Sequence, residues 1–164
     1  MRYGFLSFIL LVIISATPLA YAQEAIFLIR HAEQMLDVED PPLTEAGFDR
    51  AKTWATVFRD SGIKMIYTSK KMRTKQTGEV IAQELNIPLQ KVSRRDIDGL
   101  VNQVREEHAD DLVLIVTHSK ILPKLLKAFA PSGEYPTIKP DDYDNLFVIV
   151  PKGKAEPTVM RLRY

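Results

Sequence analysis

Short apolar runs alternate with longer amphipathic segments along most of this 164-residue chain. The apolar runs have the length of buried strands, and the other segments repeat their apolar residues at helical spacing. The predicted strands are residues 25–29, 63–67, 90–93, 112–116, 146–150 and 158–162, and the predicted helices are 44–61, 72–85, 98–107 and 121–129. This alternation predicts an α/β fold, a three-layer α/β/α sandwich with a mostly parallel central sheet. Because a short turn joins the last two strands, we expect an antiparallel edge strand.

The helix predicted over residues 44–61 has the clearest end signals. Thr44 can cap its first turn through the side-chain oxygen, and Gly62 is a typical helix stop. Trp54 and Phe58 lie on one face of this helix at helical spacing. We therefore expect that face to pack against the sheet.

Residues 1–22 have the order of a secretory signal peptide. A positive start at Arg2 precedes a largely apolar run over residues 5–14, and Ala20 and Ala22 form an A-x-A pattern. The apolar run is too short for a spanning helix, which needs roughly 20 residues. We expect cleavage after Ala22, a single domain over residues 23–164, and a periplasmic or secreted protein. The alternative is an uncleaved segment that anchors the chain.

The composition excludes several kinds of site. The chain has no cysteine, which excludes disulfides, thiolate zinc sites, iron–sulfur clusters and a cysteine nucleophile. Its 22 Lys and Arg residues against 21 Asp and Glu residues give a formal net charge of +1. This balance gives no electrostatic indication of a nucleic-acid partner. The oligomeric state is left open.

Histidine and arginine side chains follow three of the predicted strands. Arg30 and His31 follow the first strand, Arg73 lies shortly after the second, and His118 and Ser119 follow the most apolar strand. The carboxyl ends of parallel strands meet at one edge of a sheet, where ligands bind. Arginine forks fit phosphate oxygens, and a neutral histidine can act as a nucleophile. The sequence therefore predicts an anion site, in which Ser119 either binds the anion or caps the next helix.

Four motifs carry a family resemblance, and they are residues 27–33, 43–47, 67–77 and 116–119. In this order they resemble the histidine phosphatase superfamily, the phosphoglycerate mutase-like group with the Arg-His-Gly signature. The resemblance covers residues 25–164. Within the superfamily, the chain is similar to the small secreted bacterial members. It implies a histidine acid phosphatase-type phosphoric monoester hydrolase that works without a metal ion or other cofactor.

The resemblance also implies a role for each site residue. His31 is the nucleophile that takes the phosphoryl group, and Arg30 and Arg73 hold the phosphoryl oxygens. His118 donates a hydrogen bond to the group in transfer, and water then releases phosphate from His31. Ala32 stands where the signature has glycine.

The general acid that protonates the leaving group is left open. Asp98 and Glu33 are the candidates, and the third interpretation is that no dedicated carboxylate acts. A phosphohistidine, acyl phosphate or aryl phosphate needs such an acid least, because its leaving group departs readily. The sequence does not name the substrate.

The segment between residues 85 and 112 is too short to add a lid to the predicted strand and helix there. We therefore expect an open site, which favours a phosphatase over a mutase that shields its phosphoenzyme from water. The expected partner is a small phosphorylated substrate or a phosphoprotein, with no stable membrane attachment after signal cleavage.

Two other classes of function remain as alternatives. One is a phosphate- or phosphoprotein-binding module of the same fold with weak or no turnover. The other is a metal-dependent hydrolase that uses His31, Glu33 and His118.

Overall fold

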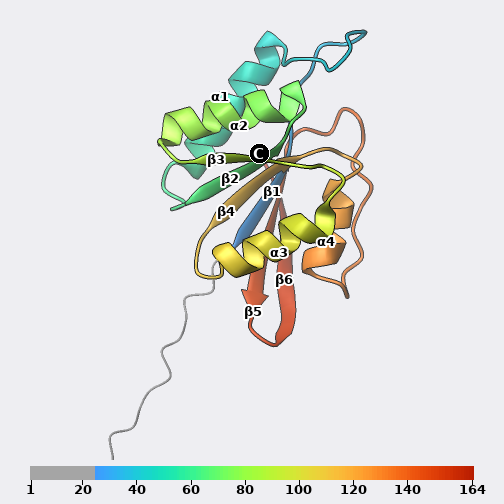
Figure 1. Cartoon of the computed structure of the whole chain (residues 1–164). Coiled ribbons are helices and arrows are strands. Elements are labelled where there is room, and N and C mark those ends of the chain that lie inside the picture. Colours follow the sequence, from blue (N-terminus) through green and yellow to red (C-terminus); the bar gives the residue numbers. More distant parts are fainter. Residues whose placement is uncertain (1–24) are drawn as a thin grey trace, which may run out of the picture.

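A six-stranded mixed sheet forms the centre of the fold, and the structure, a computed structural model, describes residues 25–164 (Figure 1). The strand order is β3-β2-β4-β1-β5-β6, in which β3, β2, β4 and β1 are parallel. The strands are β1 (Ile26–Arg30), β2 (Met65–Ser69), β3 (Leu89–Val92), β4 (Val113–Thr117), β5 (Asn145–Lys152) and β6 (Ala155–Arg163). The predicted α/β class with a mostly parallel sheet is confirmed.

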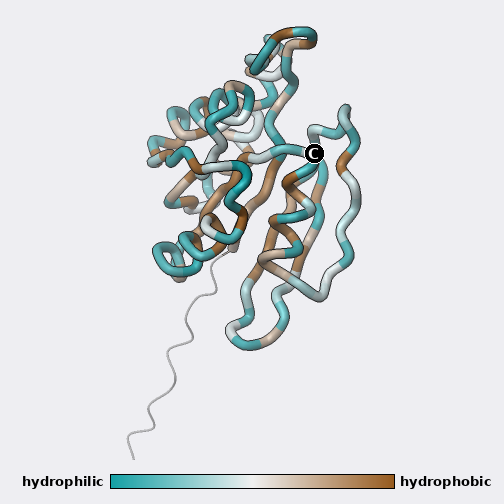
Figure 2. The backbone as a smooth tube through the Cα atoms, turned by 45° about the vertical axis from the view of Figure 1, so that its right-hand side comes forward, coloured by the Kyte–Doolittle hydropathy of each residue, from teal (hydrophilic) through white to brown (hydrophobic). Residues whose placement is uncertain are grey.

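Helices cover both faces of this sheet (Figure 1). On one face lie α1 (Glu45–Phe58) and α2 (Met72–Leu85), and on the other lie α3 (Ile97–Glu107) and α4 (Leu122–Phe129). Neighbouring residues of β1 point to opposite faces, so Ile29 packs with Trp54 of α1, whereas Leu28 packs with Leu125 of α4. Because both faces of the central strands β1 and β4 are covered, these two strands are apolar up to their last residue, and Figure 2 shows brown segments in the interior.

The antiparallel part of the sheet is larger than predicted. β6 is the edge strand and pairs antiparallel with β5, as expected, but β5 also pairs antiparallel with β1. The reason is the loop over residues 130–144, which follows α4 and has no helix or strand. This loop returns the chain to the edge of the sheet where β1 ends. There Leu146 lies opposite Ile29, and β5 runs back along β1.

Most predicted ends agree with the structure, and the differences have simple reasons. The helix over residues 72–85 is confirmed, and Thr44 caps α1 by accepting a hydrogen bond from the Gly47 amide at 3.1 Å. α1 ends at Phe58, three residues before the predicted end, and Gly62 has a φ of 80° in the turn that follows. β1, β2 and β4 continue past their predicted ends into polar residues, because the backbone ladder extends there, as in the pairing of Arg30 with Thr117.

No helix within residues 25–164 is long and apolar enough to cross a membrane. The predicted signal peptide, residues 1–22, lies outside the described residues.

The contact between α1 and the loop after β1 gives a stability prediction. Gly47 is buried, and a Cβ atom there would overlap the main-chain carbonyl of Glu33. We therefore expect Gly47→Ala to lower the free energy of unfolding by about 1–3 kcal/mol, although alanine favours a helix. Urea unfolding followed by circular dichroism measures this change.

The matched control is Thr53→Ala, an exposed position on the same helix. It should change the free energy of unfolding by no more than about 0.5 kcal/mol. If both variants were equally stable, the contact between α1 and Glu33 would not restrict this position.

Candidate active site

Two buried histidines meet at the carboxyl edge of the sheet. His31 follows β1 and His118 follows β4, and these two strands are paired neighbours. The ring centroids of His31 and His118 are 5.5 Å apart, and the two residues are 3% and 6% exposed. The predicted meeting of these strand ends therefore occurs, and it brings both imidazoles to one place.

The protonation state of His31 follows from its hydrogen bonds. Its Nδ1 lies 2.8 Å from the carbonyl oxygen of Ala32, and a carbonyl only accepts, so Nδ1 carries the hydrogen. Nε2 then has a free lone pair, which accepts a hydrogen bond from Arg73 Nε at 3.1 Å. Burial, together with the positive charges of Arg30 and Arg73, lowers the pKa of His31 to about 3. His31 is thus a neutral imidazole whose nucleophilic nitrogen faces an arginine.

His118 is held by a hydroxyl group of the neighbouring strand. Its Nε2 lies 3.0 Å from Ser69 Oγ, which also accepts from the Lys71 amide and lies 2.6 Å from Thr74 Oγ1. Among the described residues, the buried Nδ1 of His118 has no hydrogen-bond partner. Burial and the nearby Arg73 lower the pKa of His118 to about 4. The ring is therefore fixed on one side, and its other nitrogen makes no hydrogen bond to the described residues.

Arg30 is fixed by the loop that precedes β5. Its Nη1 donates to the carbonyl oxygens of Lys139 and Pro140 at 3.0 and 2.7 Å. Its guanidinium carbon lies 4.1 Å from the centroid of the Tyr143 ring. Arg30 Nε is buried without a partner among the described residues, so one donor of this arginine has no protein acceptor.

Arg73 is positioned by the first turn of α2. Thr77 Oγ1 accepts from the Ala32 amide at 3.0 Å and donates to the Arg73 carbonyl at 2.7 Å. Asp40 accepts from the Met72 amide and lies 4.0 Å from Arg73 Nη1. One threonine therefore links the chain after His31 to the turn that carries Arg73.

The two candidate general acids lie in other surroundings. Glu33 accepts from Arg50 Nε with both carboxylate oxygens, at 2.7 and 2.8 Å. Asp98 is exposed in the first turn of α3 and lines a hollow together with Lys124 and Lys127. The structure thus brings together Arg30, His31, Arg73 and His118. It pairs Glu33 with Arg50 and places Asp98 in an exposed hollow that none of these four residues lines.

Ser119 is half-buried and directly follows His118. The N-cap of α4 is Ile121, and no side chain caps this helix, so Ser119 does not serve as its cap. The predicted capping role of Ser119 is therefore wrong, and its role in anion binding stays a prediction.

Ser69 and Tyr143 are the contacts that the sequence analysis missed. Ser69 lies in a motif that was noted, but its contact to His118 depends on the pairing of β2 with β4. Tyr143 lies in an irregular loop and contacts Arg30, 113 residues away in the chain. For Tyr143, no local pattern signals such a contact.

A metal site has no ready ligand set here. Within residues 25–164, no group of three or more His, Cys, Asp or Glu side chains lies close enough to hold a metal ion. The arrangement suits an anion instead, because two arginines and two histidine nitrogens converge and Arg30 Nε and His118 Nδ1 lack protein partners.

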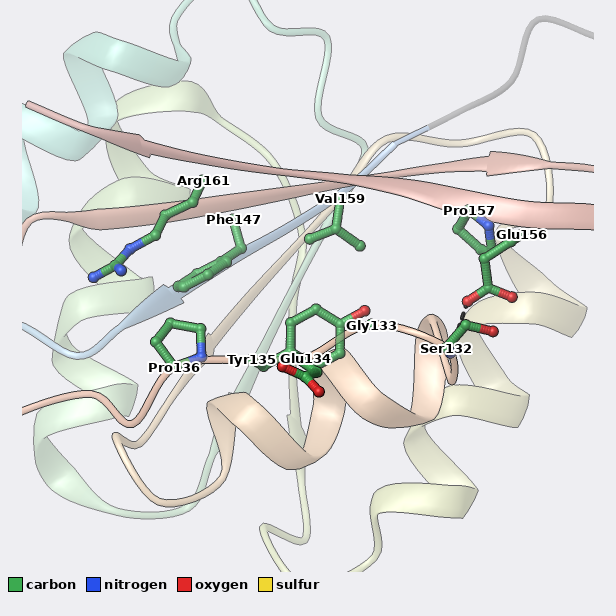
Figure 3. A pocket seen from close by; sticks show the side chains of 10 residues that line it. All are labelled: Ser132, Gly133, Glu134, Tyr135, Pro136, Phe147, Glu156, Pro157, Val159 and Arg161. Carbon is green, nitrogen blue, oxygen red and sulfur yellow. Dashed lines mark hydrogen bonds between the residues drawn. The ribbon is translucent and has the colours of Figure 1, made fainter.

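Two larger hollows of different character also lie on the surface. One, of about 490 Å³, adjoins this site at Ser69, and half of the residues that line it are basic. The other, of about 800 Å³, lies between the loop over residues 132–136 and the β5–β6 hairpin (Figure 3). Tyr135, Phe147 and Val159 line the second hollow, and neither histidine of the site does.

Comparisons with known proteins agree with this geometry. The model of the histidine phosphatase superfamily (branch 1) matches residues 26–96, which include Arg30, His31 and Arg73. No curated protein matches the chain. The superfamily is thus supported by a stretch that contains three of the four converging residues.

Solved structures with the same fold are similar over most of this chain. The protein histidine phosphatase SixA complexed with tungstate has a TM-score of 0.71 and 21% identity, covering 85% of this chain and 96% of that chain. YhfR from Bacillus stearothermophilus has a TM-score of 0.68 and 19% identity, covering 83% and 95%. A mycobacterial glucosyl-3-phosphoglycerate phosphatase has a TM-score of 0.65 and 12% identity, covering 86% and 98%.

The lowered histidine pKa values predict how stability depends on pH. The unfolded chain takes up protons at its histidines near pH 6.5, whereas folded His31 and His118 stay neutral down to pH values of about 3 and 4. Lowering the pH from 6.5 to 4 should therefore reduce the free energy of unfolding, by about 1.4 kcal/mol per pH unit for each histidine.

His31→Asn tests this linkage. In the variant, one histidine fewer takes up a proton on unfolding. The slope of its free energy of unfolding against pH, between pH 6.5 and 4, should therefore be shallower by about 1.4 kcal/mol per pH unit. Urea unfolding at half-unit pH steps measures both slopes, and above pH 7.5 the two should coincide. Equal slopes in the acid range would contradict a neutral, buried His31.

Proposed function

We propose that this chain is a histidine phosphatase that hydrolyses a phosphomonoester or a phosphohistidine through a phosphohistidine intermediate on His31, without a metal ion. The observation that carries this proposal is the unprotonated Nε2 of His31, buried beside Arg73, Arg30 and His118. The match to the superfamily model over residues 26–96 supports the phosphatase class.

Binding places the phosphoryl group between the arginines and histidines. Arg73 Nε, which donates to His31 Nε2, turns to a phosphoryl oxygen when substrate binds and frees the nucleophile. Arg30 Nε and His118 Nδ1 supply two further donors, and Ser119 contributes its hydroxyl. The negative charge of the dianion raises the pKa of His118 from its low value, which favours a proton on His118 when substrate is bound, whereas Nε2 of His31 stays unprotonated for attack.

Transfer then proceeds in two steps. His31 Nε2 attacks phosphorus, the bond from phosphorus to the leaving group breaks, and the leaving group takes up a proton from water. The Ala32 carbonyl, which accepts from Nδ1, stabilises the positive charge on the phosphorylated imidazole. Water next attacks phosphorus, the P–N bond breaks, and inorganic phosphate leaves with His31 restored. The arginines stabilise the charge of both transition states.

We propose further that no carboxylate protonates the leaving group. Glu33 binds Arg50 with both oxygens, and Asp98 lies beside Lys124 and Lys127. Favoured substrates then have good leaving groups, such as a phosphohistidine. The similar SixA structure is described as a protein histidine phosphatase, which supports the phosphohistidine option, and the glucosyl-3-phosphoglycerate phosphatase supports the phosphomonoester option.

The proposed setting is the periplasm or the cell exterior, with residues 1–22 removed and residues 23–164 acting as a single domain. This part of the proposal rests on the signal-peptide pattern of the sequence.

A phosphate-binding module of the same fold is the second candidate function. The two observations that favour it are Ala32 at the glycine position of the signature and the placement of the two candidate acids, because Glu33 pairs with Arg50 and Asp98 lines a separate, exposed hollow. A metal-dependent hydrolase has less support, because Glu33 pairs with Arg50 rather than with the two histidines.

Turnover of p-nitrophenyl phosphate by residues 23–164 tests the proposed function. We expect activity that is unchanged by EDTA and that falls at least about a thousandfold in His31→Ala, because that variant lacks the nucleophile. The matched control is His108→Ala, since His108 bonds Asp111 rather than the site residues, and it should keep its activity.

Two other outcomes of this assay would support the alternative functions. Activity that EDTA abolishes would support the metal-dependent hydrolase. Tight binding of inorganic phosphate without turnover of aryl phosphates or phosphohistidine would support the binding module.

The absence of a carboxylate acid predicts a strong dependence on the leaving group. We expect kcat/KM to fall at least about a hundredfold from p-nitrophenyl phosphate to glycerol 2-phosphate. An alkoxide departs poorly when no general acid protonates it, and general-acid catalysis typically contributes a rate factor of about a hundred or more. Asp98→Asn should change neither rate. If Asp98→Asn slowed only the alkyl phosphate by tenfold or more, Asp98 would be the acid.

A further inference from the structure

A basic hollow adjoins the candidate active site. It has a volume of about 490 Å³, and its lining residues are Asp40, Ser69, Lys70, Lys71, Val92, Ser93, Arg94 and Arg95. It meets the catalytic centre at two points, because Ser69 holds His118 and Asp40 lies 4.0 Å from Arg73. A molecule whose phosphoryl group lies at His31 can therefore extend into this hollow.

The charges of the hollow are unbalanced. Four cationic side chains line it against one carboxylate, that of Asp40. Asp40 is already engaged, since it accepts from the Met72 amide and lies 3.6 Å from Lys71 Nζ. Within residues 25–164, Lys70, Arg94 and Arg95 make no ion pair, although other exposed lysines of this surface do, such as Lys91 with Glu79. The hollow thus keeps a net positive charge that no protein group neutralises.

This positive charge acts on the catalytic centre itself. Arg94 and Lys71 both contribute to the lowered pKa of His118, and Arg94 also acts on Arg73. A ligand group that neutralises the hollow would relieve this repulsion, and a cationic group would increase it. A volume of this size fits part of a small molecule, since ligand pockets commonly measure about 300–1,000 Å³.

We propose that the hollow is a second anion subsite, which binds a further phosphate or carboxylate group of the same substrate molecule. The preferred substrate is then a small polyanion, with one phosphoryl group at His31 and another acidic group beside Arg94, Arg95 and Lys70. This inference rests on the proposed function of the site and narrows its substrate class.

Matched phosphonates, which are not hydrolysed, test the subsite by calorimetry. Propane-1,3-bisphosphonate carries two acidic groups and propylphosphonate carries one, on the same carbon chain. We expect the bisphosphonate to bind residues 23–164 at least about tenfold more tightly in 50 mM salt. The advantage should shrink at 0.5 M salt, because salt screens exposed charges.

Two double variants identify the residues. Arg94→Gln/Lys70→Gln should reduce the advantage of the bisphosphonate by about fivefold to tenfold, since exposed ion pairs are weak singly and act together here. It should leave the affinity for propylphosphonate within about twofold. The control Lys124→Gln/Lys127→Gln removes the same charge from the hollow that contains Asp98 and should keep the full advantage.

Equal affinities of the wild-type chain for the two phosphonates would overturn the subsite. The subsite would also be wrong if Arg94→Gln/Lys70→Gln kept the tighter binding of the bisphosphonate, or if the control variant lost it to the same extent. Turnover of p-nitrophenyl phosphate distinguishes a failure of the subsite from a failure of the proposed function, because this small substrate needs only the site at His31. If neither phosphonate bound, both the subsite and the proposed anion site would be wrong.

Discussion

The candidate active site depends on one buried, uncharged imidazole, that of His31. The Ala32 carbonyl accepts from Nδ1 of His31, so the nucleophilic lone pair resides on Nε2, and burial keeps the ring neutral. A charged imidazolium would have no lone pair, and the opposite tautomer would direct it at the carbonyl. A single main-chain hydrogen bond therefore decides whether phosphoryl transfer to this residue is chemically open.

The rest of the site is arranged around that ring. β1 and β4 bring His31 and His118 together, α2 supplies Arg73, and the loop before β5 fixes Arg30 through carbonyl oxygens and Tyr143. Placing these cations beside two histidines would be costly if the rings were charged. The low pKa values of His31 and His118 avoid that repulsion, because both rings stay uncharged. The open basic hollow extends the same electrostatic preference to the rest of a substrate.

Much of this arrangement could be predicted from the sequence, because strand ends are local features. Arg30, His31 and His118 follow apolar runs, and parallel strands necessarily bring such ends to one edge. The contacts of Ser69 and Tyr143 could not be predicted, since the first depends on strand order and the second on an irregular loop. Asp98 illustrates another limit, because the buried face of α3 is formed by Leu100, Val101 and Val104, which leaves Asp98 exposed.

The most direct measurement is the position of phosphate on the enzyme during turnover. The chain is mixed with p-nitrophenyl phosphate, quenched in alkali within milliseconds, and examined by peptide mass spectrometry and ³¹P NMR. The account predicts a phosphoramidate on Nε2 of His31, absent from His31→Ala and present in His108→Ala. Turnover with no phosphoenzyme, or phosphate on Nδ1 or on another residue, would contradict it.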